Sequence, residues 1–189
     1  MKKVMLKSTI SLAVALASTQ LFASGFALNE QSISGMGTGF AGRSSSAEDA
    51  STVYGNPAGM SLLQRDQVTV GVAAIDAKTN LKNVKGGPPG GTSDGDMVPF
   101  TSVPMGFFVK QLGNGWALGL GAYAPFGLVT NYESTSASRY YGDKSVVKVV
   151  TLQPTVSYAF NDMVSIGFGP TINRLSGELT SATPFPNPA

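Results

Sequence analysis

From residue 68 onward the chain alternates apolar residues with small or polar residues, and this period of two limits its fold more than any other feature. The clearest run, 150–160, carries Val, Leu, Pro, Val, Tyr and Phe at its even positions and Thr, Gln, Thr, Ser and Ala between them. Successive side chains of a β-strand point to opposite faces, so this run has one apolar face and one small or polar face. Further runs with the same pattern bring the predicted number of strands to five: 68–72, about 100–110, 116–123 and 164–173.

The connections between these runs distinguish a membrane barrel from a soluble sandwich, which would alternate in the same way. Leu112-Gly113-Asn114-Gly115 and Asn161-Asp162 are signals for tight hairpins, whereas the connections at about 82–98 and 131–145 are long and polar. Short turns that alternate with long loops are typical of outer-membrane barrels. Aromatic residues near strand ends fit either an interfacial girdle or ordinary core packing: Trp116, Tyr158 and Phe160. The sequence therefore predicts an all-β fold, a transmembrane antiparallel β-barrel.

The first 23 residues have the layout of a cleaved secretory signal. Three lysines precede an apolar run at 10–17, and Ala23 stands at the expected cleavage site. The apolar run is too short to cross a bilayer as a helix, which needs about 20 apolar residues, and no later segment offers them. We therefore expect export, with a signal peptide at 1–23, a separate segment at 24–66 and barrel strands at 67–189.

The chain contains no Cys and no His, and this composition removes whole classes of chemistry. Thiol nucleophiles, disulfides, Cys/His metal sites and Ser-His-Asp arrangements are all excluded, so we expect neither an enzyme nor a metal or other cofactor. An enzyme would have to work with Ser, Asp and Glu alone. The net charge of +2 falls when the signal lysines are removed, which leaves no basic patch for nucleic acid.

The predicted strands are too few to close a barrel. Outer-membrane barrels need at least about eight strands. The chain ends in a proline-rich stretch, 183–189, and proline cannot take part fully in a strand ladder. We therefore expect this sequence to be the N-terminal part of a larger barrel, broken off in an extracellular loop.

Residues 25–66 do not alternate and are rich in Gly, Ser and turn-forming residues. A short helix is expected at about 47–53. The glycine-rich run 35–39 is not followed by the Lys-Ser/Thr pair of a phosphate-binding loop, so nucleotide binding is rejected. Asn56-Pro57-Ala58 can shape a turn, because Asn bonds readily to backbone groups and Pro fixes its own φ.

An ordered series of motifs in this segment resembles the mature N-terminus of the FadL/TodX family. The motifs are Gly25-Phe26-Ala27-Leu28-Asn29-Glu30-Gln31-Ser32, Ser34-Gly35-Met36-Gly37, Ala41-Gly42, Ala47-Glu48-Asp49-Ala50-Ser51 and Asn56-Pro57-Ala58. Ala124-Pro125-Phe126-Gly127-Leu128 and the stretch 151–158 are similar to the third and fourth strands of that family. The resemblance covers nearly all of the mature residues, and it implies a 14-stranded barrel with residues 24–66 folded inside it as a hatch.

The resemblance also implies a function, the uptake of long-chain fatty acids or other hydrophobic small molecules across the outer membrane. In the family a kink in the third strand opens the barrel wall, so that ligand can leave sideways into the membrane. The residues that carry these expectations are the hatch motif Asn56, Pro57 and Ala58, the ligand-proximal Phe26, Leu28 and Asn29, and the lateral gate Pro125, Phe126 and Gly127. The hatch motif has two open interpretations, a gating element or simply a turn before the first strand.

Three cations are candidates for contacting a ligand carboxylate or, alternatively, are solvated charges at the bases of loops: Arg139, Lys148 and Arg174. Pro154 and Pro170 show that proline alone does not mark the gate, and we expect both at bulges or irregular pairings near strand ends. The expected partners are a hydrophobic ligand, outer-membrane lipid and lipopolysaccharide, and the outer-membrane assembly machinery.

Other interpretations of the barrel remain open. A structural or adhesive barrel would resemble the family without carrying a substrate, and ligand retained by the purified protein would exclude it. A general diffusion porin would need a charged, open lumen, whereas the inward positions predicted here are small and weakly charged.

Overall fold

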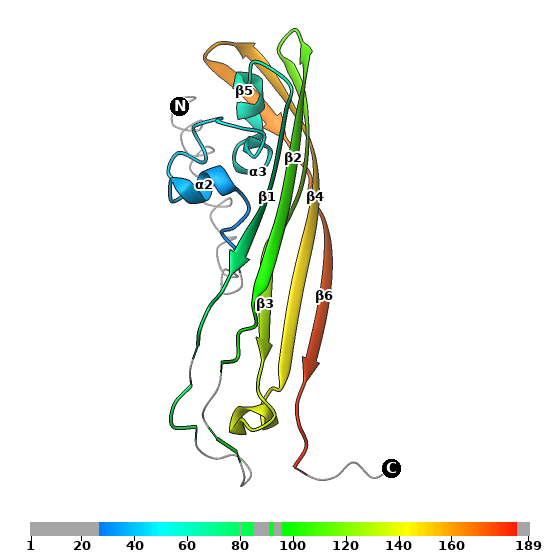
Figure 1. Ribbon diagram of the computed structural model, residues 1–189. Coiled ribbons are helices and arrows are strands. Elements are labelled where there is room, and N and C mark those ends of the chain that lie inside the picture. The colour runs from blue at the N-terminus through cyan, green and yellow to red at the C-terminus, as the bar shows by residue number, and fades with distance from the viewer. Residues whose placement is uncertain (1–26, 80, 85–90, 93–95, 185–189) are drawn as a thin grey trace, which may run out of the picture.

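The computed structural model describes residues 27–79, 81–84, 91–92 and 96–184. It shows one long, curved antiparallel sheet, with the residues before the first strand lying against one face of the sheet (Figure 1). The predicted signal peptide, its cleavage site and Phe26 lie outside the described residues. Within the described ranges no helix is long and apolar enough to cross a bilayer.

The sheet is antiparallel throughout, and its first five strands form a meander in which each strand pairs with the next along the chain. Its strands are β1 (Gln67–Ile75), β2 (Thr101–Gly113), β3 (Trp116–Asn131), β4 (Lys144–Asn161), β5 (Val164–Phe168) and β6 (Ile172–Thr180). β3 and β4, with 16 and 18 residues, are much longer than the roughly 5 to 6 residues typical of soluble sheets. The predicted all-β, antiparallel fold is confirmed.

β5 and β6 are two segments of one strand. Both pair with β4, and the pairs Val156↔Phe168 and Leu152↔Ile172 follow one unbroken register. In that register Pro170, in the interruption, falls opposite Pro154, and neither residue has an N–H to give to a ladder. The expectation that Pro154 lies near a strand end is wrong, because β4 begins at Lys144 and places it in the middle of the strand.

Short turns and long loops lie at opposite ends of the sheet (Figure 1). The β2–β3 turn uses positive φ at Gly113, Asn114 and Gly115, which Gly and Asn adopt more readily than other residues. At the other end the loops 76–100 and 132–143 contact each other, since the Thr92 N–H donates to the Thr135 carbonyl at 2.8 Å. This end also holds a 3-10 helix, η4 (Ala137–Tyr140).

The residues before β1, which we call the hatch segment (described from 27 to 66), form three short helices. These are α2 (Ile33–Gly37), α3 (Thr52–Gly55) and the 3-10 helix η3 (Pro57–Leu62). The helix expected at 47–53 is displaced toward the C-terminus. The Asp49 carboxylate accepts the Ser51 N–H at 2.8 Å, a local turn that competes with helix until Thr52.

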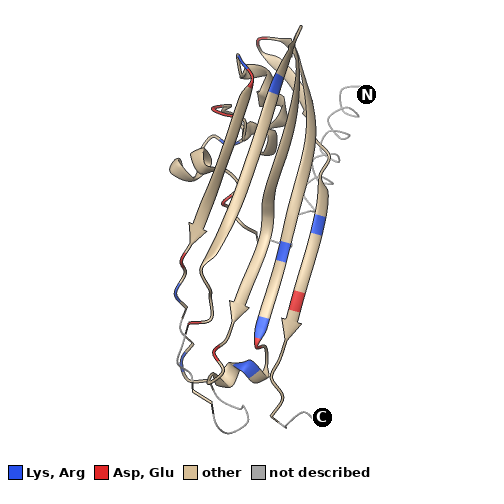
Figure 2. Ribbon diagram, turned by 45° about the vertical axis from the view of Figure 1, so that its right-hand side comes forward, with Lys and Arg blue, Asp and Glu red and all other residues tan. Residues whose placement is uncertain are grey.

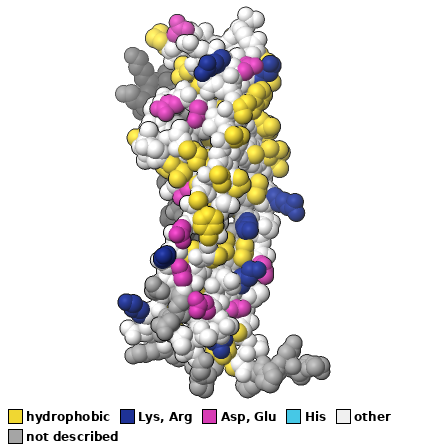
Figure 3. All heavy atoms as spheres, in the orientation of Figure 1, with side chains coloured by type: hydrophobic (Ala, Val, Ile, Leu, Met, Phe, Trp, Pro, Cys, Tyr) yellow, Lys and Arg dark blue, Asp and Glu magenta, His cyan; other side chains and the backbone are white. Residues whose placement is uncertain are grey.

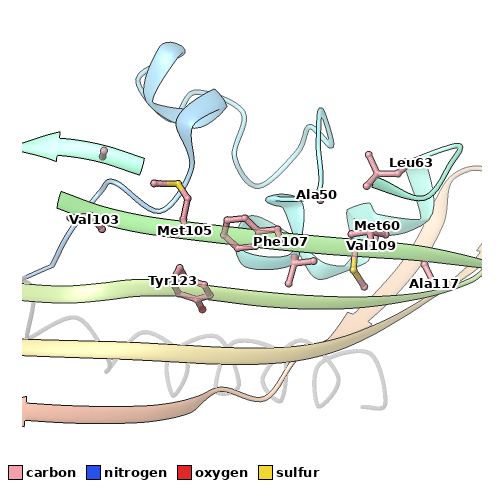
Figure 4. Close-up of a cluster of buried hydrophobic side chains, with 11 residues drawn as sticks. Ala50, Met60, Leu63, Val103, Met105, Phe107, Val109, Ala117 and Tyr123 are labelled. Atoms are coloured by element: carbon pink, nitrogen blue, oxygen red, sulfur yellow. The ribbon is translucent and has the colours of Figure 1, made fainter. Parts of the chain in front are cut away.

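The inner face of the sheet holds the apolar core, which lies between the hatch segment and β1–β3 (Figure 4). Val53 and Met60 of the hatch segment are fully buried against Phe107 and Val109 of β2. The alternation of β2 turns these β2 side chains inward and leaves their neighbours Phe108 and Lys110 outside.

The outer face of the sheet is apolar but exposed. Figure 3 shows part of it as yellow side chains over the upper strands, and Figure 2 shows few charged bands within the strands there. Soluble monomers rarely expose an apolar surface this continuous, whereas lipid would cover it. Its residues include Val68, Val70, Val72, Leu118, Leu120, Val150, Leu152, Ile166 and Phe168.

Candidate functional site

β3 carries a bulge at the predicted gate. Its pairing with β4 runs in one register to Tyr123↔Thr151 and resumes one residue out of step at Phe126↔Val149. Ala124 and Pro125 therefore share one place in the ladder, and Pro125 has no N–H to donate there. Because strand side chains alternate, the extra residue turns Phe126 to the inner face that Val149 shares.

The pairing between β2 and β3 stops just before this bulge. The last pair is Gly106↔Ala122, and from there to its start β2 pairs only with β1. The hatch segment bridges the gap, because the Leu28 N–H donates to the Pro125 carbonyl at 2.9 Å. An isolated antiparallel bridge joins Ala27 to Phe126. The hatch segment thus occupies an edge of β3 that β2 leaves unpaired.

A groove with a volume of about 720 Å³ lies along this gap. Volumes of 300–1,000 Å³ are typical of sites for small molecules. The groove is lined both by inward-facing residues, such as Met105 and Tyr123, and by outward-facing ones, such as Pro104 and Ala122. It therefore reaches both faces of the barrel wall.

The inner face of β4 changes character along its length. Beside the hatch segment it presents a buried polar row, Thr151, Gln153, Thr155 and Ser157. Toward the long loops it presents Val147 and Val149, which lie opposite Gly177 and Leu175 of β6. The half of the inner face that the hatch segment leaves free is therefore apolar around the groove.

A buried hydrogen-bonded pair connects the hatch segment to the bulged strand. The Tyr123 hydroxyl donates to Gln153 Oε1 at 2.6 Å, and Gln153 Nε2 donates to the Val53 carbonyl of α3 at 3.1 Å. The Tyr123 ring also contacts the rings of Tyr54 and Phe107, with centroids 4.8 and 5.8 Å away. The residue next to the bulge is thus held by the hatch segment through both polar and aromatic contacts.

The hatch motif lies against β5. Asn56 Nδ2 donates to the Ser44 carbonyl at 3.0 Å, which closes the hatch loop, and Pro57 begins η3. Ser165 Oγ donates to the Ala58 carbonyl at 3.1 Å. A Cβ atom at Gly167 would lie only 2.3 Å from the Ala58 nitrogen, so the missing side chain is what allows this contact.

We expect Gly167→Val to displace the hatch segment from β5, because its side chain would overlap the backbone at Ala58. Amide hydrogen exchange at 53–59 should rise by about tenfold or more. Gly106→Val is the matched control, since a Cβ there meets only Val70, at 3.8 Å. Equal exchange in the two variants would contradict the docking of the hatch motif on β5.

The other predicted site residues fall in different places. Leu28 and Lys148 line the groove, with Phe126 and Gly127 of the predicted gate, whereas Asn29 is exposed beside Glu30. Arg139 does not line the groove. It lies in η4, where its guanidinium donates to the Ser136 carbonyl at 2.7 Å and stacks 4.2 Å from the centre of the Tyr140 ring.

Arg174 also lies outside the groove lining. It pairs with Val150, on the face of β6 opposite to Asn173. Asn173 shares the inner face with Thr151, whose hydroxyl donates to Asn173 Oδ1 at 2.6 Å. A carboxylate contact by any of the three cations stays a prediction, and the structure brings only Lys148 to the groove.

Asp96 holds the chain beside Met97 and Val98, which line the groove. Its carboxylate accepts the N–H groups of Val98 at 3.1 Å and Thr79 at 3.2 Å, and these bonds lower its pKa below the ordinary 3.8. Because the pKa of Asp96 is lowered, the contact stabilises the fold fully above the ordinary pKa of 3.8. This stabilisation is lost as the pH falls through the lowered pKa. Next to it, the Met97 carbonyl accepts the Asn131 N–H of β3 at 2.8 Å.

Sequence reasoning did not single out Tyr123, Gln153 or Gly167. Gln153 could have been noticed, since it is the largest side chain on the small, polar face of the run 150–160. Its partner is Val53, 100 residues away, and no local pattern indicates that pairing.

Long antiparallel strands, an apolar exposed face and an inner face covered by the protein's own N-terminal residues define the wall of an outer-membrane β-barrel. A crystal structure of a Pseudomonas aeruginosa FadL homologue shares this fold, with a TM-score of 0.65 at 21% identity over 86% of this chain and 44% of that chain. The chain belongs to the outer membrane protein transport family OMPP1/FadL/TodX, whose family model matches residues 14–187. It is a protein of the bacterial outer membrane, as predicted.

Curated relatives agree with this assignment. The long-chain fatty acid transport protein of Salmonella typhi is 31% identical over 196 residues, covering 100% of this chain and 45% of the relative. That of Escherichia coli K12 is 31% identical over 94% of this chain and 41% of its own length. Outer membrane protein P1 of Haemophilus influenzae is 30% identical over 86% of this chain and 39% of its own length. The chain thus spans less than half the length of these relatives.

Proposed function

We propose that the protein takes up long-chain fatty acids or similar hydrophobic molecules, which bind inside the barrel and leave sideways through the bulged β3. The observation that carries this proposal is the groove of about 720 Å³ beside the bulge, which is lined by residues of both faces of the wall. A route through the wall needs a place where strands do not pair, and β2 and β3 part there. The names of the relatives support fatty acids as the substrate class.

Lateral release suits the energetics of a hydrophobic ligand. Unsatisfied backbone groups cost several kcal/mol in lipid, so an opening in the wall must be covered or filled when ligand is absent. Leu28 does this for the Pro125 carbonyl, and Asn131 bonds to the loop at Met97. Movement of the hatch segment would uncover the opening, while the apolar groove keeps the ligand out of water throughout.

The proposed process makes and breaks no covalent bond, so we propose that the protein is not an enzyme. The hatch segment acts as the plug, and its Asn56-Pro57-Ala58 motif holds it against β5. Lys148 lines the groove from the outer side of the wall and is the proposed contact for the carboxylate of a ligand that leaves there. We also propose that the outer-membrane assembly machinery inserts the protein, and that outer-leaflet lipid surrounds it.

Exchange of apolar groups for hydroxyls in the groove should weaken ligand binding. We expect Val103→Thr with Val149→Thr to lower the affinity for a labelled long-chain fatty acid by about tenfold, since each loses roughly one buried methyl contact. The control is Val68→Thr with Val70→Thr, the same change on the outer face of β1. Equilibrium binding to the purified full-length protein is the measurement. Unchanged affinity in the groove variant would mean that the ligand binds elsewhere, and no ligand bound by the parent protein would favour a structural or adhesive barrel.

A further inference from the structure

The outer face of the sheet changes from apolar to basic toward the long loops. On β4, Lys148 and Lys144 follow Val150 on the same face, because the strand alternates without a break. On β6, Arg174 pairs with Val150 and Glu178 pairs with Val146, so these two also face outward. Figure 2 shows the charged bands on both strands in the half of the sheet near the loops.

The position of these charges along the membrane normal follows from the length of the strand. Near the short turns, Trp116, Tyr158 and Phe160 form an aromatic group, with neighbouring ring centroids 4.7 and 4.9 Å apart. Such a group marks one interface of a barrel. From Tyr158 to Lys148 the chain advances about ten residues, or roughly 33 Å along the strand and roughly 25 Å along the membrane normal at a tilt of about 40°. An apolar band is about 25 Å tall, so Lys148 and Arg174 lie at its other edge.

That edge belongs to the outer leaflet. Barrels of the outer membrane have short turns on the periplasmic side and longer loops outside the cell. The aromatic group lies beside the short turns, and the basic residues lie toward the long loops. The lipid headgroups at this level are those of the outer leaflet.

Two of the basic side chains have no counter-charge among the residues that the structure describes. Lys144 Nζ is 2.9 Å from a Glu178 carboxylate oxygen, which neutralises it. Among the described residues, no hydrogen bond or ion pair engages the side chain of Lys148 or Arg174. Lys148 lies opposite Ser176, two residues from Arg174, and such diagonal neighbours are about 7–8 Å apart. An anion between them would relieve the repulsion between the like charges.

We propose that Lys148 and Arg174, with Ser176 between them, bind a phosphate group of lipopolysaccharide in the outer leaflet. Arg and Lys are the usual partners of phosphate, Arg through paired N–H donors. A phosphorylated lipid fits better than free phosphate, because exposed apolar residues adjoin the cations on the same face. Val150, Leu152 and Ile172 would contact its acyl chains below the phosphate.

The test uses the full-length protein, expressed from its own gene and purified from outer membranes in mild detergent. Lipopolysaccharide retained per mole of protein should fall at least about fivefold in the variant Lys148→Gln with Arg174→Gln. Lys110→Gln is the matched control, a cation on the same outer face near the short turns, where it pairs with Asp66 at 3.3 Å. Heat-modifiable gel migration confirms that each variant is a folded barrel.

A second measurement identifies the ligand. Delipidated protein is mixed with vesicles that contain lipopolysaccharide, with vesicles of phosphatidylglycerol, or with inorganic phosphate. We expect lipopolysaccharide vesicles to bind the parent more tightly than the double variant, and inorganic phosphate at millimolar concentration not to displace them. The proposal would be overturned if the double variant retained as much lipopolysaccharide as the Lys110→Gln control. It would also be overturned if the parent bound phosphatidylglycerol vesicles as tightly as lipopolysaccharide vesicles, or if inorganic phosphate displaced the lipopolysaccharide vesicles completely. No uptake is measured, so the result is independent of the proposed transport.

Discussion

Deletion of residues 30–65 from the full-length protein is expected to leave the barrel assembled and to raise its single-channel conductance severalfold. The hatch segment supplies none of the strands that the structure describes, so its loss removes no ladder between strands. It does remove the cover from the inner face, where Val53 and Met60 now exclude water. The polar row of β4 would then line an open, wetted lumen.

The measurement is conductance of the purified protein in planar bilayers, with heat-modifiable gel migration to show that the barrel has formed. Deletion of residues 81–84 in the loop after β1 serves as the control, because this stretch is not part of any strand. Conductance equal to that of the parent would mean that the hatch segment does not plug the pore.

Replacement of Pro125 and Gly127 by Val is expected to slow the uptake of hydrophobic substrate by roughly tenfold while equilibrium binding from outside is largely kept. A β-branched residue at 125 restores the missing N–H, so that β3 can regain ladder pairing at this point. A Cβ at 127 would lie 3.0 Å from the end of the Leu28 side chain, which would have to move aside. Because that side chain end is flexible, we expect no loss of stability.

Labelled fatty-acid uptake and equilibrium binding should be measured side by side in cells that express each variant at the parental level. Pro154→Val is the matched control, since Pro154 is also a strand proline but lies in the regular pairing of β3 with β4 and outside the groove lining. Parental uptake by a double variant whose β3 is shown to be straight would exclude exit at this point. Passage past the hatch segment into the periplasm would then be the better account.

The fold class follows from local pattern because strand side chains repeat every two residues, and a sheet between lipid and lumen needs two different faces. The run 150–160 shows this best, since its even positions are the exposed apolar ones and its odd positions turn inward. Strand ends were harder to predict. β4 continues to Lys144 and β6 to Thr180 through mixed residues, whose strand conformation depends on pairing with each other.

The sequence indicated the position of the irregularity in β3 but not its geometry. Pro125 and Gly127 indicate a defect in a strand, yet the sequence does not show that Ala124 and Pro125 share one partner, or that Phe126 consequently changes face. A bulge is a property of two strands, because the extra residue is extra only relative to the neighbour.

The sequence by itself determined the alternating strands, the short turns, the separate segment before residue 67 and the family motifs, because each of these depends on residues close together in the chain. Only the tertiary structure decided which strands part, what fills the gap and which surface each cation faces. Gln153 meets Val53 and Gly167 meets Ala58 because the hatch segment folds back onto strands 100 or more residues later. Such contacts form when separate surfaces come together, and their energy depends on the shape of both surfaces, which local sequence patterns do not carry.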